Sequence, residues 1–379
     1  MNTGLAKIAI KLLMSDRAKF FTLILGVTFA VFLILQMTSL FTGILTRSTS
    51  NVLNVGAQVW IMDPTVQSDR TIVPLPDYVL SAVRSMPGVA HAFPIYQGSG
   101  LVKLPNGAYQ SVNIVGLDDD SLFGRPVIIE GNLYDIYSED AFIVVKDAEY
   151  KKLGSPKIGA TFEINDHRGV IVAIARPIIP GLFGNPTLYT TYTRAIQYLP
   201  TTRFTMSYVL VNLKDPSYLD SLKQEVTRIG YRALSQDEFV NMIKNYYMFK
   251  TGMGINILMM TLISFIVGTS IAGQTFYAFV LENLEKFGAL KAIGATNGDL
   301  IKTIILQSSF VSFLGFGFGN LICSSYIAFA KMRIPNYAAI ITHKDIFMTF
   351  IVVILITAFS SYLGIRRVIK IEPFDVFRG

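Results

Sequence analysis

Four long apolar runs constrain what this chain can fold into more than any other feature. None contains Asp, Glu, Lys or Arg, and they cover residues 20–41, 253–281, 303–330 and 346–365. Each reaches or exceeds the roughly 20 residues that an α-helix needs to cross a hydrocarbon core. Only 16% of the 379 residues are charged, against about 25% in a soluble domain. We therefore predict a membrane protein with four transmembrane helices, at 20–43, within 236–281, at 303–330 and at 346–365.

Basic residues indicate how these helices are oriented. They gather before the first run, between the second and third, and after the fourth: Lys7, Lys11, Arg17 and Lys19; Lys286, Lys291 and Lys302; Arg366, Arg367, Lys370 and Arg378. Because cytoplasmic loops carry the excess of Lys and Arg, we expect both termini and residues 282–302 in the cytoplasm, with 331–345 as a short outer loop. Residues 1–19 are predicted to form an amphipathic elbow helix in the headgroup plane, and 366–379 a basic cytoplasmic tail. The first run exceeds the roughly 7–15 apolar residues of a signal peptide, so we expect it to be retained.

A long hydrophilic insert, residues 44–235, separates the first two runs. Two stretches of it have the order strand–helix–strand: "AQVWIMD", "LPDYVLSAVRSMPGV" and "AHAFPIYQGSGLVKL" near its start, and "SYVLVNLKD", "PSYLDSLKQEVTRIG" and "YRALS" near its end. Between them, short β-branched runs alternate with Gly, Pro, Asn and Asp, which is typical of a β-rich region. We predict an extracytoplasmic, periplasmic α+β domain of two lobes.

The insert leads into the second apolar run without a proline. Residues 236–250, "QDEFVNMIKNYYMFK", contain no strong helix breaker, although Gly252 and Gly254 could hinge the helix, each at about 1 kcal/mol relative to Ala. We predict one stalk helix at 236–281 that continues from the outer domain into the membrane. A plain linker between two domains is the alternative.

The sequence offers no site for catalysis, a metal ion or a cofactor. The segment "GSPKIGAT" has glycines at phosphate-loop spacing but Ala160 where the lysine belongs. The three histidines, His91, His167 and His343, lack the spacing of zinc ligands, and the apolar runs hold no ionisable residue that would couple transport to an ion. The glutamines in or beside the runs are predicted to bridge helices: Gln36, Gln274 and Gln307. We therefore expect no enzyme activity, and the energy for any transport must come from another subunit.

The charged segment at 282–302 has a regular pattern. Its apolar residues recur every three positions, at Leu284, Phe287, Leu290 and Ile293, which gives a short helix one apolar edge. Its acidic residues come first and its basic ones later, as the helix dipole favours, and Gly294 is suited to ending the helix. Such a helix could dock its apolar edge into a groove on a soluble partner, or it could rest on lipid headgroups. Periodicity alone leaves both interpretations open.

This segment, "LENLEKFGALKAIGATNGDLI", resembles a motif of the FtsX-like, MacB-type permeases of ABC transporters, E-x-x-x-E-[IF]-G-x-L-[RK]-A-[IL]-G-A-[ST]. The matching positions are Glu282, Lys286, Phe287, Gly288, Leu290, Lys291, Ala292, Ile293, Gly294, Ala295 and Thr296. Lys286 departs from the pattern, because many members carry Glu there, and Glu285 stands just before it. The C-terminal "RRVIKIEPFDVFRG" is similar to the closing motif of the family, through Arg367, Ile371, Pro373, Phe377 and Arg378. Among the branches, the opening "FFTLILGVTFAVFLILQ" and the chain length are most similar to the DevC branch, which is linked to glycolipid export.

The resemblance implies a homodimeric permease that binds two copies of a separate ATPase subunit, which carries the ATP and Mg²⁺. Residues 282–296, with Leu284 and Glu285 included, would be the coupling helix, and ATPase motion would pass through the second span to the periplasmic domain. This mechanotransmission would expel a hydrophobic or amphiphilic cargo such as a lipid, glycolipid, lipoprotein or drug. The resemblance further implies the bacterial inner membrane, a periplasmic membrane-fusion adaptor and an outer-membrane duct. A non-transporting relative that activates periplasmic cell-wall hydrolases is the alternative.

Small residues allow close helix approach in two of the spans. The second span carries Ser264, Gly268 and Ala272 at intervals of four, and the third carries Gly315 and Gly319. We assign the second span to the contact between the two subunits of the dimer. The third span is assigned to packing within a subunit.

Overall fold

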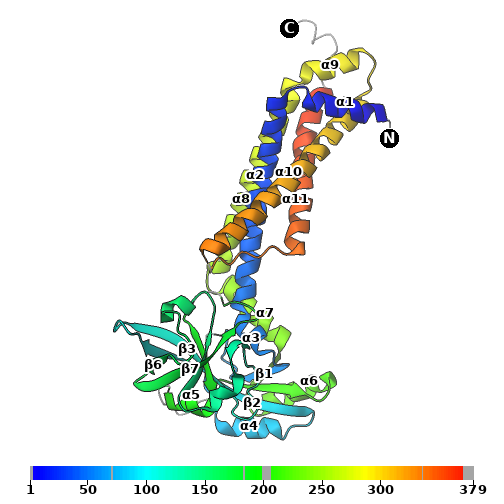
Figure 1. Cartoon of the computed structure of the whole chain (residues 1–379). Helices are drawn as coiled ribbons and strands as arrows, with labels where there is room; N and C mark the ends of the chain where they lie inside the picture. Colours follow the sequence, from blue (N-terminus) through cyan, green and yellow to red (C-terminus); the bar gives the residue numbers. More distant parts are fainter. Residues whose placement is uncertain (1–2, 70, 182–183, 199–205, 335, 370–379) are drawn as a thin grey trace. The chain divides into compact units, whose positions relative to one another are not determined.

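The computed structural model describes residues 3–69, 71–181, 184–198, 206–334 and 336–369. The chain divides into two compact units, residues 1–43 with 254–379, and residues 44–253 (Figure 1). The helices of the first unit are α1 (Thr3–Met14), α2 (Arg17–Ser48), α8 (Met253–Glu282), α9 (Leu284–Ala292), α10 (Asn297–Arg333) and α11 (His343–Ile369). Among the described residues, α2, α8, α10 and α11 are long and apolar enough to cross a membrane, as predicted from the four runs.

The helices extend beyond the apolar runs that predicted them. Helix α10 begins at Asn297 and ends at Arg333, so the connector to α11 comprises residues 334–342 rather than 331–345. A charged residue ends the part of a helix that suits hydrocarbon, whereas the hydrogen-bonded backbone can continue into water. The start of α10 is fixed instead by a capping box, in which Thr296 and Asp299 satisfy each other's backbone N–H groups.

Helix α2 packs against both α8 and α10 at their small residues. A methyl group on Gly315 of α10 would lie 2.6 Å from the side chain of Val27, and one on Gly319 would lie 2.5 Å from that of Val31. The third span therefore packs within the subunit, as predicted. On α8, a methyl group on Gly268 would lie 3.2 Å from the Cβ atom of Ala30.

The assignment of the small residues of the second span to the dimer contact is wrong. Ser264, Gly268 and Ala272 are all buried within this single chain, and Ala272 belongs to the same core cluster as Ala30 of α2. Small residues at intervals of four predict a close helix neighbour. They carry no information on whether that neighbour belongs to the same chain.

Two of the three glutamines bridge helices, as predicted. Gln36 of α2 accepts a hydrogen bond from the Cys323 Sγ of α10, at 3.7 Å, and donates one to the Tyr337 hydroxyl in the connector. Gln307 of α10 donates a hydrogen bond to the backbone oxygen of Ala9 in α1, at 3.1 Å. Gln274 does not follow the prediction, since it lies on the exposed side of α8 and makes no hydrogen bond within the described residues.

The second unit contains the two predicted strand–helix–strand repeats. The first is β1 (Val59–Met62), α4 (Asp77–Arg84) and β2 (Val89–Lys103), and the second is β9 (Tyr208–Leu213), α6 (Leu219–Arg228) and β10 (Arg232–Ser235). They interleave, because β1 pairs antiparallel with both β9 and β10. The resulting order β10–β1–β9–β2 is that of a split βαβ fold, whose core takes apolar residues of α4 and α6.

The predicted β-rich lobe lies between the two repeats. Its elements are β3 (Tyr109–Leu117), β4 (Val127–Gly131), β5 (Ala141–Val145), β6 (Thr161–Ile164), β7 (His167–Arg176), β8 (Thr187–Thr191), α5 (Tyr192–Tyr198), and the short helices η1 (Leu133–Tyr137) and η2 (Tyr150–Leu153). The 15-residue strand β2 joins the lobes, since its first half pairs with β9 and its second half with β3. Each lobe has its own buried cluster, so the insert is an α+β domain of two lobes. The remaining elements are α3 (Ser50–Val55) and η3 (Pro216–Tyr218).

The predicted continuous stalk helix is interrupted. Helix α7 (Gln236–Phe249) has its C-cap at Lys250, Gly252 adopts a left-handed conformation with φ of +71°, and α8 begins at Met253. A left-handed residue cannot continue an α-helix, and glycine adopts it without strain. Helix α7 instead packs within the second unit, where Phe239 lies fully buried against Trp60 with ring centroids 5.3 Å apart.

Candidate functional site

A single buried asparagine makes the turn between α8 and α9. The backbone N–H of Asn283 still reaches the carbonyl oxygens of Phe279 and Val280, at 3.2 and 3.3 Å. Its side-chain amide also donates to the Phe279 oxygen at 2.8 Å, so this carbonyl near the end of α8 accepts two hydrogen bonds. The chain changes direction here without leaving a buried polar group unsatisfied.

Most of the predicted apolar edge of α9 faces the chain's own core and is not free to dock on a partner: Leu284, Phe287 and Leu290 pack inward, whereas Ile293, the fourth residue of that edge, is exposed. Phe287 is fully buried, with 0% of its surface exposed. It belongs to the same cluster as Leu13 of α1 and Leu300 of α10, and Leu284 and Leu290 pack against that cluster. Burial of this edge follows from ordinary hydrophobic packing. The sequence period predicted three residues of this edge correctly, but not the exposure of Ile293 or the helices that cover the other three.

The opposite side of the segment is exposed. We define the exposed face of α9 as Glu285, Ala289, Ala292 and Ile293. Ile293 is the outstanding residue, because 82% of its surface is accessible. The other members are two alanines and one acidic residue, so Ile293 is the only large apolar side chain of this face.

The other predicted coupling residues are distributed between the two sides. Glu282, Lys286, Gly294 and Thr296 are exposed, Lys291 and Ala295 are half-buried, and Gly288 is buried. Gly294 ends the segment with a φ of +104°, and the Ala295 N–H donates to the Leu290 oxygen at 3.0 Å. Gly294 therefore supplies the predicted left-handed stop.

Two contacts, here called the polar clasp, tie the start of α9 to the turn between α1 and α2. The Lys286 Nζ donates to the Ser15 Oγ at 2.9 Å and to the Asn283 Oδ1 at 2.8 Å. The Lys19 Nζ lies 2.9 Å from a carboxylate oxygen of Glu282. Lys286 departs from the family motif, and its place in the clasp gives that departure a structural role.

The turn between α1 and α2 is itself fixed by Asp16. Its carboxylate accepts hydrogen bonds from the backbone N–H groups of Ala18 and Lys19, at 3.1 and 3.2 Å. The hydrogen bond from the Lys19 N–H is the main reason why the pKa of Asp16 lies below its usual value. An ionised carboxylate at the N-terminus of α2 also suits the helix dipole.

The far end of α9 contacts the last helix. The Lys291 Nζ donates to the backbone oxygen of Ile369, the final residue of α11, at 3.2 Å. Residues of the predicted C-terminal motif, namely Ile371, Pro373, Phe377 and Arg378, lie outside the part of the chain that the structure describes. Helix α9 is thus held by contacts to α1, α2, α10 and α11.

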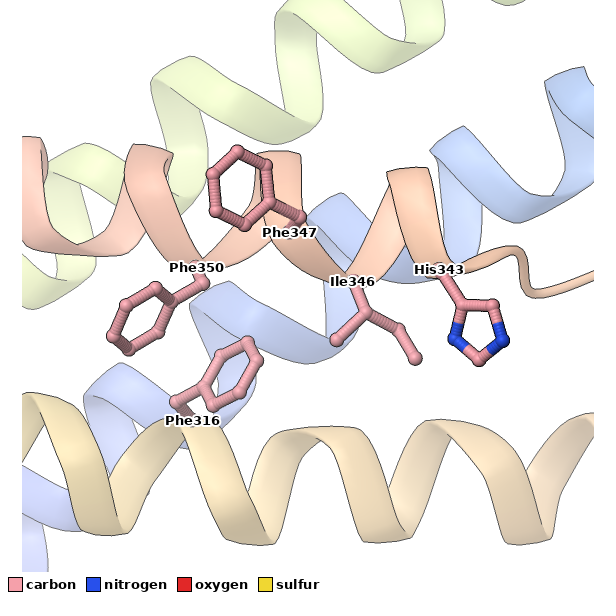
Figure 2. Close-up of a pocket in the computed structure, with 5 residues that line it drawn as sticks. All are labelled: Phe316, His343, Ile346, Phe347 and Phe350. Carbon is pink, nitrogen blue, oxygen red and sulfur yellow. The ribbon is translucent and has the colours of Figure 1, made fainter.

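A groove between α10 and α11 was not predicted from the sequence (Figure 2). It has a volume of about 300 Å³ and is lined by Phe316, His343, Ile346, Phe347 and Phe350. The rings of Phe316 and Phe350 approach to 5.1 Å between centroids. The lining is apolar except for the imidazole of His343 at one end, which suits an alkyl chain or a flat ring. Among the described residues, no group of three or more His, Cys, Asp or Glu could hold a metal ion.

Sequence reasoning missed the polar clasp and Asn283. Ser15 and Lys286 are separated by most of the chain, and no local pattern pairs them. Asn283 had a weak signal, since it is an asparagine directly after the last charged residue of a long apolar helix.

Comparisons with known proteins follow the division of the fold. Residues 20–229 match the family profile of the MacB-like periplasmic core domain, and residues 257–373 match that of the FtsX-like permease C-terminal region. The first profile indicates that the insert is an extracytoplasmic domain of a membrane protein.

Individual relatives are distant. The chain is 23% identical over 158 residues to HrtB of Staphylococcus epidermidis, a permease named for hemin transport, which covers 41% of this chain and only 43% of the relative. It is 21% identical to the macrolide export ATP-binding/permease protein MacB of Escherichia coli, over 97% of this chain and 59% of that protein. The periplasmic region of MacB from Actinobacillus actinomycetemcomitans superposes at a TM-score of 0.39, with 14% identity over 50% of this chain and 94% of that one. Since the MacB-like profile alone takes in more than half of the chain, the protein belongs to the MacB/FtsX-type family of ABC transporter permeases.

Proposed function

We propose that this permease is the membrane subunit of an ATP-driven exporter, and that a separate ATPase subunit docks on the exposed face of α9. The observation that carries the proposal is the arrangement at α9. One side of the helix is packed into the core through Phe287, while Ile293 is left 82% exposed at its end. An apolar side chain held in this way by a rigid support is what a docking contact requires. Two chains and two ATPase subunits, which hold the ATP and Mg²⁺, make up the proposed complex.

Motion of α9 would be passed on through its attachments. Asn283 alone separates α9 from α8, and the polar clasp joins its start to the turn between α1 and α2. Along the chain, α8 leads to the extracytoplasmic domain through the joint at Gly252. The proposal is therefore mechanotransmission through a jointed connection rather than through one continuous rod. In this arrangement both termini and α9 face the cytoplasm, and α1 lies at the surface of the inner membrane.

The proposed cargo is hydrophobic or amphiphilic, such as a lipid, a glycolipid, a lipoprotein or a drug. The groove between α10 and α11 supports an apolar ligand, because Phe316, Phe347 and Phe350 line it. Hemin and macrolides, which appear in the names of the relatives, are also large and largely apolar. A periplasmic membrane-fusion adaptor and an outer-membrane duct would complete the path, and the DevC branch stays a prediction.

A decisive experiment reconstitutes the chain with its ATPase in lipid vesicles and measures export of a fluorescent amphiphile. The same measurements are made on a shortened variant, in which residues 60–230 are replaced by a short Gly/Ser linker. The chain resumes at Tyr231, four residues before Ser235, which is the pairing partner of Val59 in the ladder of β1 with β10, so a short linker can span the gap. We expect the shortened variant to bind the ATPase normally and to export nothing.

Two outcomes would contradict this proposal. Loss of ATPase binding in the shortened variant would mean that the partner does not dock on α9 alone. If pull-downs with the full chain recover cell-wall hydrolases but no adaptor, and no amphiphile is exported, the chain would be a regulator of hydrolases instead.

A further inference from the structure

The groove between α10 and α11 has an apolar end and a polar end. At the apolar end, Phe316 and Phe350 come from different helices and point toward one another, with ring centroids 5.1 Å apart, so their rings close the groove there (Figure 2). At the polar end, the imidazole of His343 points into the space between the two helices. A groove with this polarity suits an amphiphile better than a wholly apolar ligand.

The polar end lies at the boundary of the hydrocarbon. The uncharged run of α11 begins at Ile346, so His343 and Lys344 precede it by about 3–5 Å along the helix. The headgroup layer on each side of a bilayer is about 5–8 Å thick. Because the proposed function places α9 in the cytoplasm, and α10 crosses the membrane between α9 and α11, the start of α11 lies on the outer side. Both residues are therefore at the level of the outer headgroups.

Neither residue at the polar end has a partner in the described part of the chain. His343 and Lys344 are exposed, and neither makes a hydrogen bond or an ion pair there. By contrast, the guanidinium of Arg333, at the end of α10, lies over the Phe329 ring, 5.5 Å from its centroid. Lysine is normally less frequent on the outer side of a membrane, and an anionic headgroup would give Lys344 a partner.

The size of the groove selects a single alkyl chain. Ligand pockets usually measure roughly 300–1,000 Å³, and this groove, at about 300 Å³, lies at the lower limit. It has room for one alkyl chain but not for both chains of a phospholipid. From His343 to Phe350 the helix rises about 10 Å, so a chain whose head lies at the imidazole reaches the phenyl rings.

We propose that this groove binds a phospholipid with an anionic headgroup from the outer leaflet of the membrane. One acyl chain lies along the groove and ends at the rings of Phe316 and Phe350, while the other chain stays in the bilayer. The phosphate accepts a hydrogen bond from the imidazole of His343 and is attracted by the charge of Lys344. This inference rests on the orientation in the proposed function and deepens it, because it names the class of amphiphile that enters the groove.

Photocrosslinking in lipid vesicles tests the site without the ATPase. The full chain is reconstituted with a trace of phosphatidic acid that carries a diazirine near the end of one acyl chain, and labelled peptides are identified by mass spectrometry. We expect labelling around Phe316 and Phe350. Diacylglycerol with the same diazirine chain but no phosphate should label them about 5-fold less, the factor that one basic side chain contributes at an anionic lipid surface. Equal labelling by the two lipids would overturn the selection of an anionic headgroup.

Three variants separate the headgroup contact from the groove. Lys344→Met should lower the labelling by phosphatidic acid about 5-fold, whereas Lys302→Met, which removes an exposed lysine near the start of α10, should leave it unchanged. Ile346→Trp fills the groove and should abolish labelling there, while labelling around the exposed Phe359, outside the groove, continues and shows that the variant is folded. Unchanged labelling in Lys344→Met would overturn the headgroup contact, and unchanged labelling of the groove in Ile346→Trp would overturn the site.

Export measured with the ATPase separates failure of this inference from failure of the proposed function. If the natural chain exports amphiphiles but its groove is not labelled, the lipid site is wrong and the exporter stands. If the groove is labelled as expected but no amphiphile is exported, the lipid site stands and the exporter is wrong.

Discussion

The separation of packing from docking on α9 can be tested with two single substitutions. Ile293→Ala removes the large side chain that protrudes from the exposed face, and Phe287→Ala removes the one that fills the core behind it. Their exposed fractions, 82% and 0%, predict opposite effects on stability and coupling.

The expected magnitudes follow from these exposures. Phe287→Ala should lower the free energy of unfolding by about 3–5 kcal/mol, as is usual when a buried aromatic side chain is removed. Ile293→Ala should change it by no more than about 0.5 kcal/mol, since no packing is lost. If the ATPase buries Ile293, losing about three buried carbon atoms at about 0.8 kcal/mol each costs about 2 kcal/mol of binding, or roughly 30-fold in affinity.

Both quantities can be measured on purified protein in nanodiscs. Thermal unfolding reports stability, and titration with the ATPase subunit reports affinity and the stimulation of ATP hydrolysis. Equal destabilisation by the two substitutions would refute the assignment of the faces. Wild-type affinity in stable Ile293→Ala protein would refute the docking role.

Three further outcomes are expected elsewhere in the molecule. Gly319→Ala should lower the free energy of unfolding by about 1–3 kcal/mol, because its methyl group would lie 2.5 Å from a side chain and 2.9 Å from a backbone oxygen of α2. Gly317→Ala should not, because its methyl group would meet no atom within 4 Å. Burial raises the pKa of Asp147 above its ordinary 3.8, so the folded state holds this proton more tightly than the unfolded state does. Stability therefore falls as the pH rises from about 4 through the raised pKa. Asp147→Asn should unfold at a higher temperature than the natural chain at pH 7, and the difference should vanish near pH 3. Phe347→Ala should reduce stimulation of the ATPase by amphiphiles, whereas Phe359→Ala should leave it unchanged, because Phe359 is equally exposed on α11 but lies outside the groove.

The elements of this fold were predictable because their signals are local. Uncharged runs predicted the four long helices, and strand–helix–strand spacing predicted both repeats of the extracytoplasmic domain. The insertion of β1 between β9 and β10 was not predictable, since it joins residues near 60 to residues near 210 and 235 through pairing that any β-branched strand could make.

The errors concern which neighbour covers a given face. The three-residue period of α9 and the small residues of α8 both predicted close packing correctly. Their actual neighbours come from α1 and α2 at the other end of the sequence, so no local pattern could identify them. The break before α8 has a different cause. Glycine adopts both the right-handed and the left-handed helical conformation, so Gly252 in the sequence is compatible with a continuous helix and with the end of one.

The position of the polar clasp leads to a last prediction about transmission. The nine-residue α9 is about 14 Å long, with the clasp at its start and Ile293 just beyond its end. A force applied at Ile293 therefore acts on one end of α9, while the hydrogen bonds of Lys286 hold the other end. Lys286→Met should leave the exposed face intact, so ATPase affinity should stay near that of the natural chain while export per ATP hydrolysed falls.

Lys302 provides the matched control for this change. It is an exposed lysine of the neighbouring α10 and makes no hydrogen bond or ion pair in the described part of the chain. Lys302→Met removes the same charge without touching the clasp, so its coupling should be normal. If Lys286→Met weakened ATPase binding instead of coupling, Lys286 would belong to the docking surface. If both variants coupled normally, α9 would transmit its motion through Asn283 and α8 alone, and the turn between α1 and α2 would only support it.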